Sequence, residues 1–478
     1  MDDLLEIIDY VKRAGARFAD IREQSVRNRY VVTKDARAEH LVDETNAGTG
    51  IRILYGNGWG YAATKNKTPE GLKKAADKAL ELARLASPLA NEPIILASEP
   101  KHIAKFSTKA VKDVETVPLE EPLERMIAAG EKILKQKDMI MAKGFLHMRK
   151  QKRRYANTEG SRIETELQTV MPEITAMARA NGEVKTRSFA LGGENAGYEY
   201  FADMPIEDNL ERICSEAREH CYAKQCAEGP TTLVLDPRNL SLTMHESVGH
   251  PTELDRVLGY EESNAGRSFA TLEKLHTFRY GSELVNFVAD NTWEGGLASY
   301  GYDDEGVECQ KWLMVKDGIL NGYGACRELA HKIGLERANG TTRATEYYDV
   351  PITRIPNLYL APGKKPLTKE EIIADTKDGI YIEGRGTFSI DQMRLNMQFG
   401  GDAFWQIKNG KITGMLKDVV YNAISYQFWR SCDAIADERE FERHGFTTCG
   451  KGDPSQIGQM SHGASPSRFR NIMVRRAK

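Results

Sequence analysis

Two histidines five residues apart, His245 and His250, enclose an acidic residue, Glu246, in the most distinctive short segment of the chain. Neutral imidazoles bind Zn²⁺ well, and a catalytic zinc site usually has three protein ligands and one open position. A carboxylate beside such a site can take a proton from water and pass it to a leaving amine. These residue types therefore indicate zinc-dependent hydrolysis, with His245 and His250 as metal ligands and Glu246 as general base.

Chance alone would rarely produce this segment. The chain has 10 histidines among 478 residues, which gives roughly 0.2 pairs at this spacing and about 0.03 with an acid directly after the first histidine. Two unrelated histidines on a helix nevertheless remain the alternative, because short motifs give false positives.

The spacing of the two histidines requires an irregular helix. On a regular α-helix, residues five apart are about 140° out of line, so both rings cannot face one ion. Asp236 and Pro237 are typical of a helix start, as N-cap and first helical residue. Gly249 and Pro251 disrupt helices, so we expect a bulge or a helix end there that turns His250 back toward the first histidine.

The third ligand must come from elsewhere, and Cys449 is the best candidate. It precedes a Gly-Lys-Gly segment, in which the glycines allow close packing of the backbone and the cation favours thiolate. Judged by the residues alone, a lone cysteine is more often a small buried hydrophobic residue. A metal-free alternative is a cysteine hydrolase that pairs Cys449 with His444 or His462.

Length and charge narrow the class of protein. A chain of 478 residues exceeds the usual size of one hydrophobic core, so we expect two domains. The net charge of −3 and the pI of about 6.4 give no overall basic field for nucleic acid or a membrane surface. The one basic cluster, residues 149–154, is expected to be a solvated strand edge or loop, with a phosphate-binding patch as the alternative.

The expected location is the cytoplasm. The first residues lack the pattern of a secretory signal, and no stretch approaches the 18 apolar residues of a membrane-spanning helix. Seven cysteines, an odd number, show no disulfide framework. A reducing compartment would leave a cysteine free for metal binding or catalysis.

Periodicity predicts an α+β fold in two domains. Residues 1–226 are expected to form an N-terminal α+β domain. Residues 230–478 are expected to form a mostly antiparallel β domain that carries the metal-site helix. The predicted elements of the first domain include helices at 3–14, 123–135 and 206–223, a strand at 20–32, and strand-rich segments at 155–171 and 174–190. Hairpin turns are predicted at Asn57-Gly58, Asp317-Gly318 and Asn409-Gly410.

The chain resembles the TldD/PmbA family of metallopeptidases over nearly its whole length. The segments that carry the resemblance are residues 15–22, 50–52, 58–60, 157–160, 245–250, 303–307, 357–360, 379–381 and 449–451. The tail departs from the bacterial pattern in Met460-Ser461-His462-Gly463. His462 is therefore a candidate beside the ligands or the substrate, although an exposed histidine is the more common role.

The resemblance implies one zinc per chain, held by the histidines of the His-Glu-x-x-x-His motif and by the cysteine of Cys-Gly-Lys. In this sequence these ligands are His245, His250 and Cys449, and the catalytic glutamate is Glu246. The family further implies a homodimer, or a heterodimer with a metal-free paralogue, that degrades small unfolded peptides held extended in an enclosed chamber.

Two functions follow as hypotheses. The first is zinc-dependent proteolysis of small unfolded or extended peptides, with water activated by Glu246. The alternative is a peptide-binding partner subunit with a structural zinc and no catalysis. A structural site would have a fourth protein ligand, and Glu246 would then have no purpose.

Overall fold

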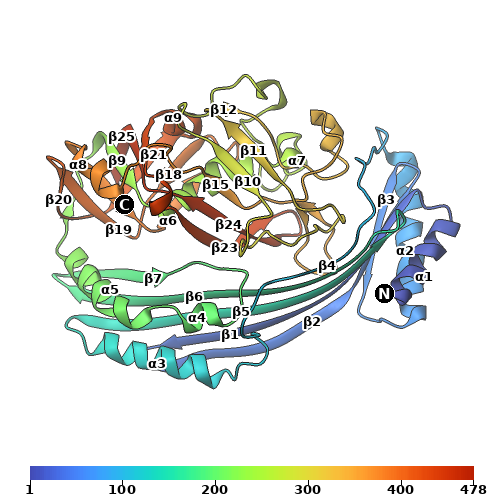
Figure 1. Cartoon of the computed structure of the whole chain (residues 1–478), viewed down its shortest axis with the longest axis horizontal. Coiled ribbons are helices and arrows are strands. Elements are labelled where there is room, and N and C mark those ends of the chain that lie inside the picture. Colours follow the sequence, from blue (N-terminus) through green and yellow to red (C-terminus); the bar gives the residue numbers. More distant parts are fainter. Residues whose placement is uncertain (478) are drawn as a thin grey trace.

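The computed structural model describes residues 1–477 and combines helices with four β-sheets, most of whose strand pairs are antiparallel (Figure 1). Long, curved strands from the first half form one broad sheet, and the second half of the chain lies on its concave side. This arrangement confirms the predicted α+β class. The division of the chain at residues 226–230 stays a prediction.

The first sheet has seven strands in the order β3-β2-β1-β5-β6-β4, with β7 paired to β6. Its strands are β1 (Phe18–Lys34), β2 (Arg37–Tyr55), β3 (Gly58–Thr64), β4 (Ile103–Ser107), β5 (Met139–Asn157), β6 (Arg162–Ala180) and β7 (Glu183–Ala190). The helices of this half are α1 (Asp2–Arg13), α2 (Pro69–Ala86), α3 (Glu120–Leu134), α4 (Glu199–Ala202) and α5 (Ile206–Cys221).

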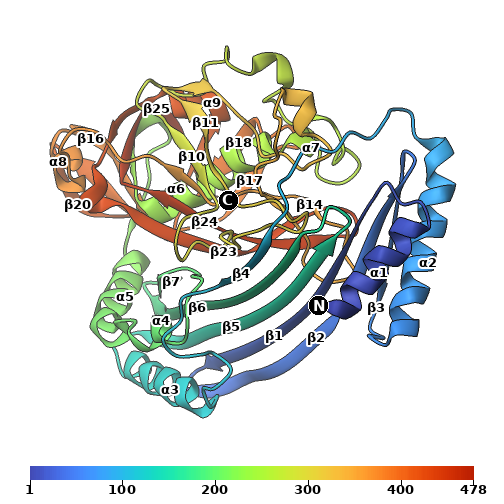
Figure 2. The same cartoon turned by 45° about the vertical axis from the view of Figure 1, so that its right-hand side comes forward.

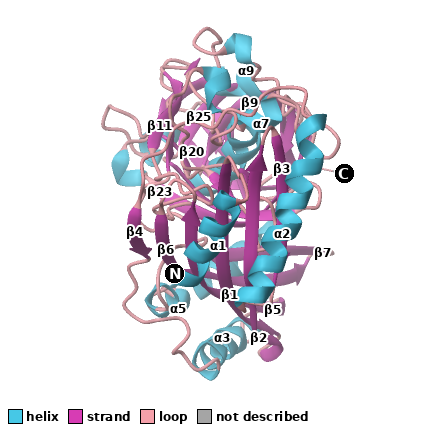
Figure 3. Cartoon of the chain, turned by 90° about the vertical axis from the view of Figure 1, so that its right-hand side faces the viewer, coloured by secondary structure: helices cyan, strands magenta, loops and turns pink. Residues whose placement is uncertain are grey.

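The helices cover the outer side of this sheet, as the side view shows (Figure 3). Successive side chains of a strand point to opposite faces, and one face is apolar. Leu146 and Met148 of β5 belong to the cluster that packs on α3 and α5, while Ile21 of β1 and Ile51 of β2 pack on α1 and α2. The alternate residues of the same strands are polar and face the second half of the chain.

The two segments of the first half that were predicted to be rich in strand are confirmed as such. Residues 155–171 and 174–190 lie in β5, β6 and β7, and the turn at residues 158–161 divides the first segment. Pro172 lies inside β6. It is tolerated there because β6 changes its outer neighbour at this point, from the bridge Val170–Glu194 to β7, which begins pairing at Glu173.

The second half contains a six-stranded sheet, in the order β12-β11-β10-β15-β24-β23. Its strands are β10 (Phe287–Asp290), β11 (Lys311–Lys316), β12 (Ile319–Leu320), β15 (Leu358–Leu360), β23 (Glu442–Lys451) and β24 (Gln456–Ala464). A two-stranded sheet joins β13 (Thr342–Arg343) and β14 (Ile352–Thr353), and short helices are α6 (Pro237–Met244), α7 (Leu254–Val257), α8 (Lys369–Ala374) and α9 (Ser425–Arg430).

A ten-stranded sheet completes the second half, in the order β17-β18-β21-β25-β9-β16-β19-β20-β8, with β22 paired to β25. Its strands are β8 (Lys224–Gln225), β9 (Gly229–Leu235), β16 (Asp378–Glu383), β17 (Phe388–Ile390), β18 (Asn396–Phe399), β19 (Ala403–Lys408), β20 (Lys411–Lys417), β21 (Val419–Ile424), β22 (Cys432–Ile435) and β25 (Ser467–Arg476). The turned view separates this sheet from the long strands below it (Figure 2).

Buried ion pairs join the two halves. Arg52 of β2 contacts Glu305 at 3.0 Å, and Arg153 of β5 pairs with Asp304. Arg52 also holds Asp20 of β1 at 2.6 Å. Because a buried charge that loses its partner is strongly destabilising, these pairs fix the position of the second half on the polar face of the sheet.

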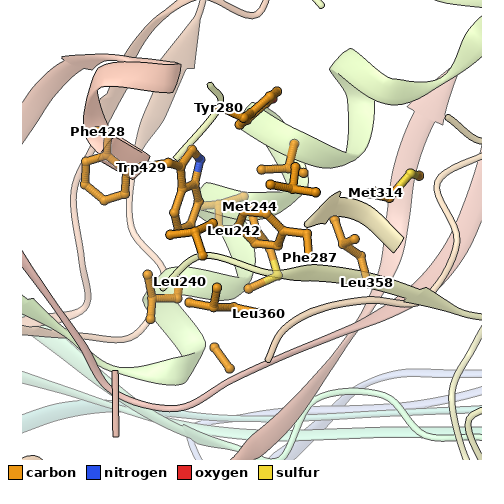
Figure 4. Close-up of a cluster of buried hydrophobic side chains, with 14 of the residues drawn as sticks. Leu240, Leu242, Met244, Tyr280, Phe287, Met314, Leu358, Leu360, Phe428 and Trp429 are labelled. Carbon is orange, nitrogen blue, oxygen red and sulfur yellow. The ribbon is translucent and has the colours of Figure 1, made fainter. Parts of the chain in front are cut away.

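A large apolar core supports α6, which leads into the segment with the two histidines (Figure 4). Leu240 and Met244 on this helix are buried against side chains of β10, β15 and α9. The labelled neighbours in Figure 4 include Phe287, Leu358 and Trp429. Within residues 1–477, no helix combines the length and the apolar character needed to cross a membrane.

Candidate metal centre and active site

The helix before the histidines begins as predicted. The side chain of Asp236 accepts a hydrogen bond from the backbone of Asn239 at 2.6 Å, and Pro237 occupies the first helical position. At its other end, after Met244, the helix does not end in a regular way. Residues 245–249 form a π-helical turn, in which the backbone N–H of His250 bonds to the carbonyl of His245. This pattern places residues five apart one above the other and brings both histidines to one side.

Packing holds the π-turn in place. The hydroxyl of Tyr280 donates to the backbone carbonyl of Ser247. The indole N–H of Trp429 donates to the side-chain hydroxyl of Ser247 at 2.9 Å. Gly249 lies so close to Ile355 that a Cβ at this position would meet its side chain at 2.9 Å. The predicted bulge is therefore a π-turn, and the glycine is required by close packing.

Three donor groups meet at this turn. The ligand atoms of His245, His250 and Cys449 lie within 4.8 Å of one another, and all three residues are buried. The sulfur of Cys449 is 3.6 Å from Nε2 of His250. The structure thus brings the three predicted ligands together, and this is the one such cluster of histidine, cysteine and carboxylate groups among the described residues.

A chain of hydrogen bonds sets the tautomer of His245. Nδ1 of His245 is 2.8 Å from Nε2 of His462, and Nδ1 of His462 is 3.2 Å from the carbonyl of Leu358. A carbonyl can only accept, so His462 donates through Nδ1 and accepts through Nε2. His245 therefore carries its hydrogen on Nδ1 and has a free lone pair on Nε2. Fully buried, His462 is not the exposed histidine that was the more common expectation.

The second ligand histidine is held by a carboxylate. Nδ1 of His250 lies 2.8 Å from Oε2 of Glu253, which leaves Nε2 directed to the cluster. Lys451 approaches the other oxygen of Glu253 at 3.3 Å. Although burial raises the pKa of Glu253, the charge of Lys451 and the bonded His250 hold it well below its usual range. A carboxylate–histidine pair of this kind orients a metal ligand.

The cation beside the cysteine differs from the predicted one. Nη2 of Arg354 lies 3.1 Å from the sulfur of Cys449. Lys451 is instead held by Asp255, at 2.7 Å and 2.8 Å from its two oxygens. Burial raises the pKa of the Cys449 thiol. His250 and Arg354 lower it by a larger amount, so the net shift is downward and favours the thiolate.

The predicted base lies near His245, because its charge raises the pKa of that ring against the larger lowering by burial. Glu246 follows the first ligand in the chain and is 6% exposed. One of its oxygens accepts a hydrogen bond from the guanidinium of Arg394. Arg394 lies in the loop between β17 and β18, where Asp391 and Ser425 hold the backbone around it. The carboxylate is thus fixed in position by a residue far away in the sequence.

The donor set suits a zinc ion. Burial lowers the pKa of His245 to about 4 and lowers that of His250, so both rings are neutral and able to coordinate at neutral pH. Zinc binds sulfur at about 2.3 Å and imidazole nitrogen at about 2.0–2.1 Å, which in a tetrahedron places the two atoms about 3.5 Å apart. The separation of 3.6 Å between Cys449 and His250 is consistent with that geometry.

The cysteine-hydrolase alternative finds no support in these contacts. His444 pairs with Glu442 at 3.2 Å, and His462 bonds to His245. Neither ring is the hydrogen-bond partner of Cys449, whose sulfur contacts His250 and Arg354.

Three further residues of the site were not expected from the sequence. Glu253 follows His250 by three residues and could have been found by helical spacing. Arg354 and Arg394 lie about a hundred or more residues from the groups that they contact, in segments without a recognisable motif. Tertiary structure alone brings them to the site.

Comparisons with known proteins find relatives over most of the chain. Residues 228–475 match the family model described as the PmbA/TldA metallopeptidase C-terminal domain, and residues 19–83 match its domain 1. A metalloprotease of Methanocaldococcus jannaschii is 30% identical over 444 residues, which cover 92% of each chain. A zinc metalloprotease TldD homologue of Saccharolobus solfataricus is 25% identical over 425 residues, covering 86% of this chain and 87% of that protein.

The fold also has solved counterparts. The structure of TldE from Thermococcus kodakarensis superimposes with a TM-score of 0.77 over 100% of both chains, at 16% sequence identity. At this identity the likeness concerns the fold alone.

Proposed function

The chain belongs to the PmbA/TldD family of metallopeptidases, and on this basis we propose that it hydrolyses extended peptides with zinc at His245, His250 and Cys449. The observation that supports this most directly is the set of three donors, with no fourth histidine, cysteine or carboxylate in the cluster as the structure describes it. Catalytic zinc sites have three protein ligands, whereas structural ones have four.

The residues around the ion would each have a defined task. Zinc, when bound, polarises the scissile carbonyl and lowers the pKa of water. Glu246 would take the proton of the attacking water and deliver it to the leaving nitrogen. Arg394 would hold the carboxylate of Glu246 toward that water. His462 and Glu253 would keep the two imidazoles oriented for coordination.

The hairpin that carries the cysteine supports an extended substrate. β23 is an edge strand of its sheet and pairs with β24. At Gly445, β23 is covered by the backbone of Gly193, because a Cβ at Gly445 would meet the carbonyl oxygen of Gly193 at 2.1 Å. Thr448 and Gly450, next to Cys449, are exposed. An exposed strand edge can pair with the backbone of an extended peptide, which gives loose sequence preference.

The active species that we propose is a dimer, either of two copies or with a metal-free paralogue. This part rests on the family resemblance, and we propose with it a chamber that admits unfolded peptides and excludes folded proteins. Folded proteins would also be rejected because their backbone groups are already paired. The cytoplasmic location stays a prediction.

The competing proposal is a peptide-binding subunit whose zinc is structural. Such a protein would bind peptides and retain zinc without cleaving them, and the ion pair of Glu246 with Arg394 would serve stability alone. Direct assay separates the two proposals.

The test compares one peptide in two states. Purified protein is incubated with an unstructured peptide and with the same segment inside a stable fold, and products are identified by mass spectrometry. We expect cleavage of the free peptide alone, loss of activity with a chelator, and recovery with Zn²⁺. Zinc-replete dimer that leaves the free peptide intact would contradict catalysis, and equal cleavage of both forms would contradict the chamber.

A further inference from the structure

The basic cluster at residues 149–154 has a place in the structure that the proposed function does not use. It lies in the middle of β5, between β1 and β6, and not at a solvated edge. Its alternate residues face opposite sides. Lys150 is neutralised by Asp113 and by Glu166 at 3.0 Å, and Arg154 is held by Asp3 at 2.8 Å. Arg149, Gln151 and Arg153 point the other way.

These three side chains line a cavity of about 210 Å³ between the long sheet and the β23–β24 hairpin. Thr447 and Gly458 form the hairpin side of this cavity, and Gly458 is the cross-strand partner of Cys449. The cavity therefore adjoins the strand that carries a proposed zinc ligand, on the side that faces the long sheet.

One wall of the cavity is aromatic. Tyr30 of β1 and His147 of β5 are cross-strand partners, and their rings stack with centroids 4.2 Å apart at 8°. Burial lowers the pKa of His147 to about 3, so this ring is neutral at physiological pH. The wall can pack against an apolar or aromatic group but adds no charge.

The guanidinium groups of the cavity are unequally neutralised. Arg153 pairs with Asp304, which also lies 3.4 Å from Arg22. Arg343 donates to the carbonyl groups of Gln459 and Ile355 and to the hydroxyl of Tyr300. Arg149 donates to the amide oxygen of Gln151 at 3.0 Å and makes no ion pair with any carboxylate of residues 1–477.

The charge balance selects the ligand. Arg149, Arg153 and Arg343 line the cavity together with two carboxylates, Asp304 and Glu346. Because Arg153 and Arg22 share Asp304, positive charge is in excess here, and Arg149 is a partly buried arginine without an ion pair among residues 1–477. An unpaired cation away from water is costly, and a carboxylate meets a guanidinium with two parallel hydrogen bonds. The uncharged Tyr30–His147 wall in the same cavity favours a carboxylate carried on an organic group over free phosphate.

We propose that this cavity is a binding site for a peptide carboxylate, with Arg149 as the residue that contacts it and the Tyr30–His147 pair as the wall for the adjoining apolar group. The inference rests on the proposed function, because it makes the cavity a subsite for the same extended peptides. The carboxylate can be the C-terminus of the peptide or an acidic side chain, and the experiment below distinguishes the two.

Binding is measured directly, so that it does not depend on catalysis. Zinc-loaded Glu246→Gln protein is titrated with three fluorescently labelled peptides of one unstructured sequence. The first ends in a free carboxylate, the second ends in an amide, and the third ends in an amide and carries one internal glutamate. We expect tighter binding of one or both acidic peptides, and Arg149→Gln should weaken that binding about 10-fold or more while the neutral peptide is unaffected.

Lys152→Gln provides the matched control, because it removes one positive charge from the same strand on the opposite face, where Lys152 is exposed. It should leave all three affinities unchanged. Arg149→Lys keeps the charge but not the paired hydrogen bonds and should retain part of the preference, which separates loss of the site from misfolding.

Several results would overturn the proposal. They are equal binding of acidic and neutral peptides by the unsubstituted cavity, equal weakening of all peptides by Arg149→Gln with wild-type thermal stability, or displacement of the acidic peptide by inorganic phosphate more readily than by acetate. Absence of peptide cleavage by the wild-type enzyme, with the binding pattern intact, would instead contradict only the proposed function.

Discussion

His245 donates from Nδ1 to Nε2 of His462 across 2.8 Å, and this bond leaves Nε2 of His245 free to coordinate. His462 is fixed in turn by the carbonyl of Leu358, on the neighbouring strand β15. A residue outside the three-donor cluster thus determines which nitrogen of His245 is free for a metal ion. The outer partner of a metal-bound histidine tunes both its orientation and its basicity.

Replacing this partner should weaken zinc binding. We expect His462→Gln to lower zinc affinity by about 10–100-fold, as is usual for such outer partners, and to lower peptidase activity at limiting zinc. His444→Gln is the control, because His444 is the register partner of His462 on β23 but bonds to Glu442. Competition with a colorimetric chelator measures the affinities. Equal zinc affinity in His462→Gln and the wild type would show that this bond does not tune the site.

Glu246→Gln should separate metal binding from catalysis. The amide keeps the shape of the side chain but cannot accept the proton, so we expect kcat to fall by about 10²–10⁴ while the zinc content is unchanged. Glu262→Gln, which alters an exposed carboxylate held by Arg267, should have no effect. Steady-state assays with metal analysis of the same samples provide the measurement. Near-normal turnover in Glu246→Gln would remove this residue from the mechanism.

Arg394 is expected to act as a positioning residue through Glu246. Arg394→Gln removes a charge-assisted hydrogen bond of roughly 1.5–3 kcal/mol, so we expect kcat to fall about 10–100-fold with little change in KM or zinc content. Arg394→Lys keeps the charge and should recover part of kcat. If Arg394 had a purely structural role, thermal stability would fall together with activity. Arg394→Lys would then fail to recover kcat even with the thermal stability of the wild type.

Stability should fall in mild acid because of a histidine far from the metal site. Burial lowers the pKa of His220, on α5, to about 4, against about 6.5 in the unfolded chain. Between these values the unfolded state binds the proton and the folded state does not. The free energy of unfolding therefore falls as the pH drops below 7, and at pH 5 it is lower by on the order of 2 kcal/mol.

The comparison is made by urea unfolding at pH 7 and pH 5. His220→Gln should lose less stability over this range than the wild type, whatever its stability at pH 7. His40→Gln, at an exposed histidine of β2, should keep the wild-type dependence. An unchanged pH dependence in His220→Gln would contradict the assigned shift.

The sequence predicted the parts of the site that are local. His245, Glu246 and His250 are neighbours in the chain, and the interruption of the helix followed from Gly249 and the five-residue spacing. Its form, a π-turn, depends on Tyr280 and Trp429, which hold Ser247 from other elements. The Gly-Lys-Gly segment made Cys449 the best candidate, but a buried hydrophobic cysteine was the more common role, and the family resemblance assigned it as a ligand.

The parts that could not be predicted depend on distant contacts. Arg354 and Arg394 have no local pattern that links them to Cys449 and Glu246. The basic residues of β5 were expected at a solvated strand edge or loop, but β5 is an inner strand, and ion pairs and the cavity neutralise or enclose them on both faces. At Pro172, local propensity favours a break, but the change of neighbouring strand allows β6 to continue.

X-ray absorption at the zinc edge of the purified protein tests the central claim most directly. We predict one zinc per chain, with one sulfur at about 2.3 Å, two imidazole nitrogens at about 2.0–2.1 Å and a further light atom that is not from the protein. The sulfur contribution should disappear in Cys449→Ala. A wild-type spectrum without sulfur, or with four ligands from the protein, would contradict an open catalytic site formed by His245, His250 and Cys449.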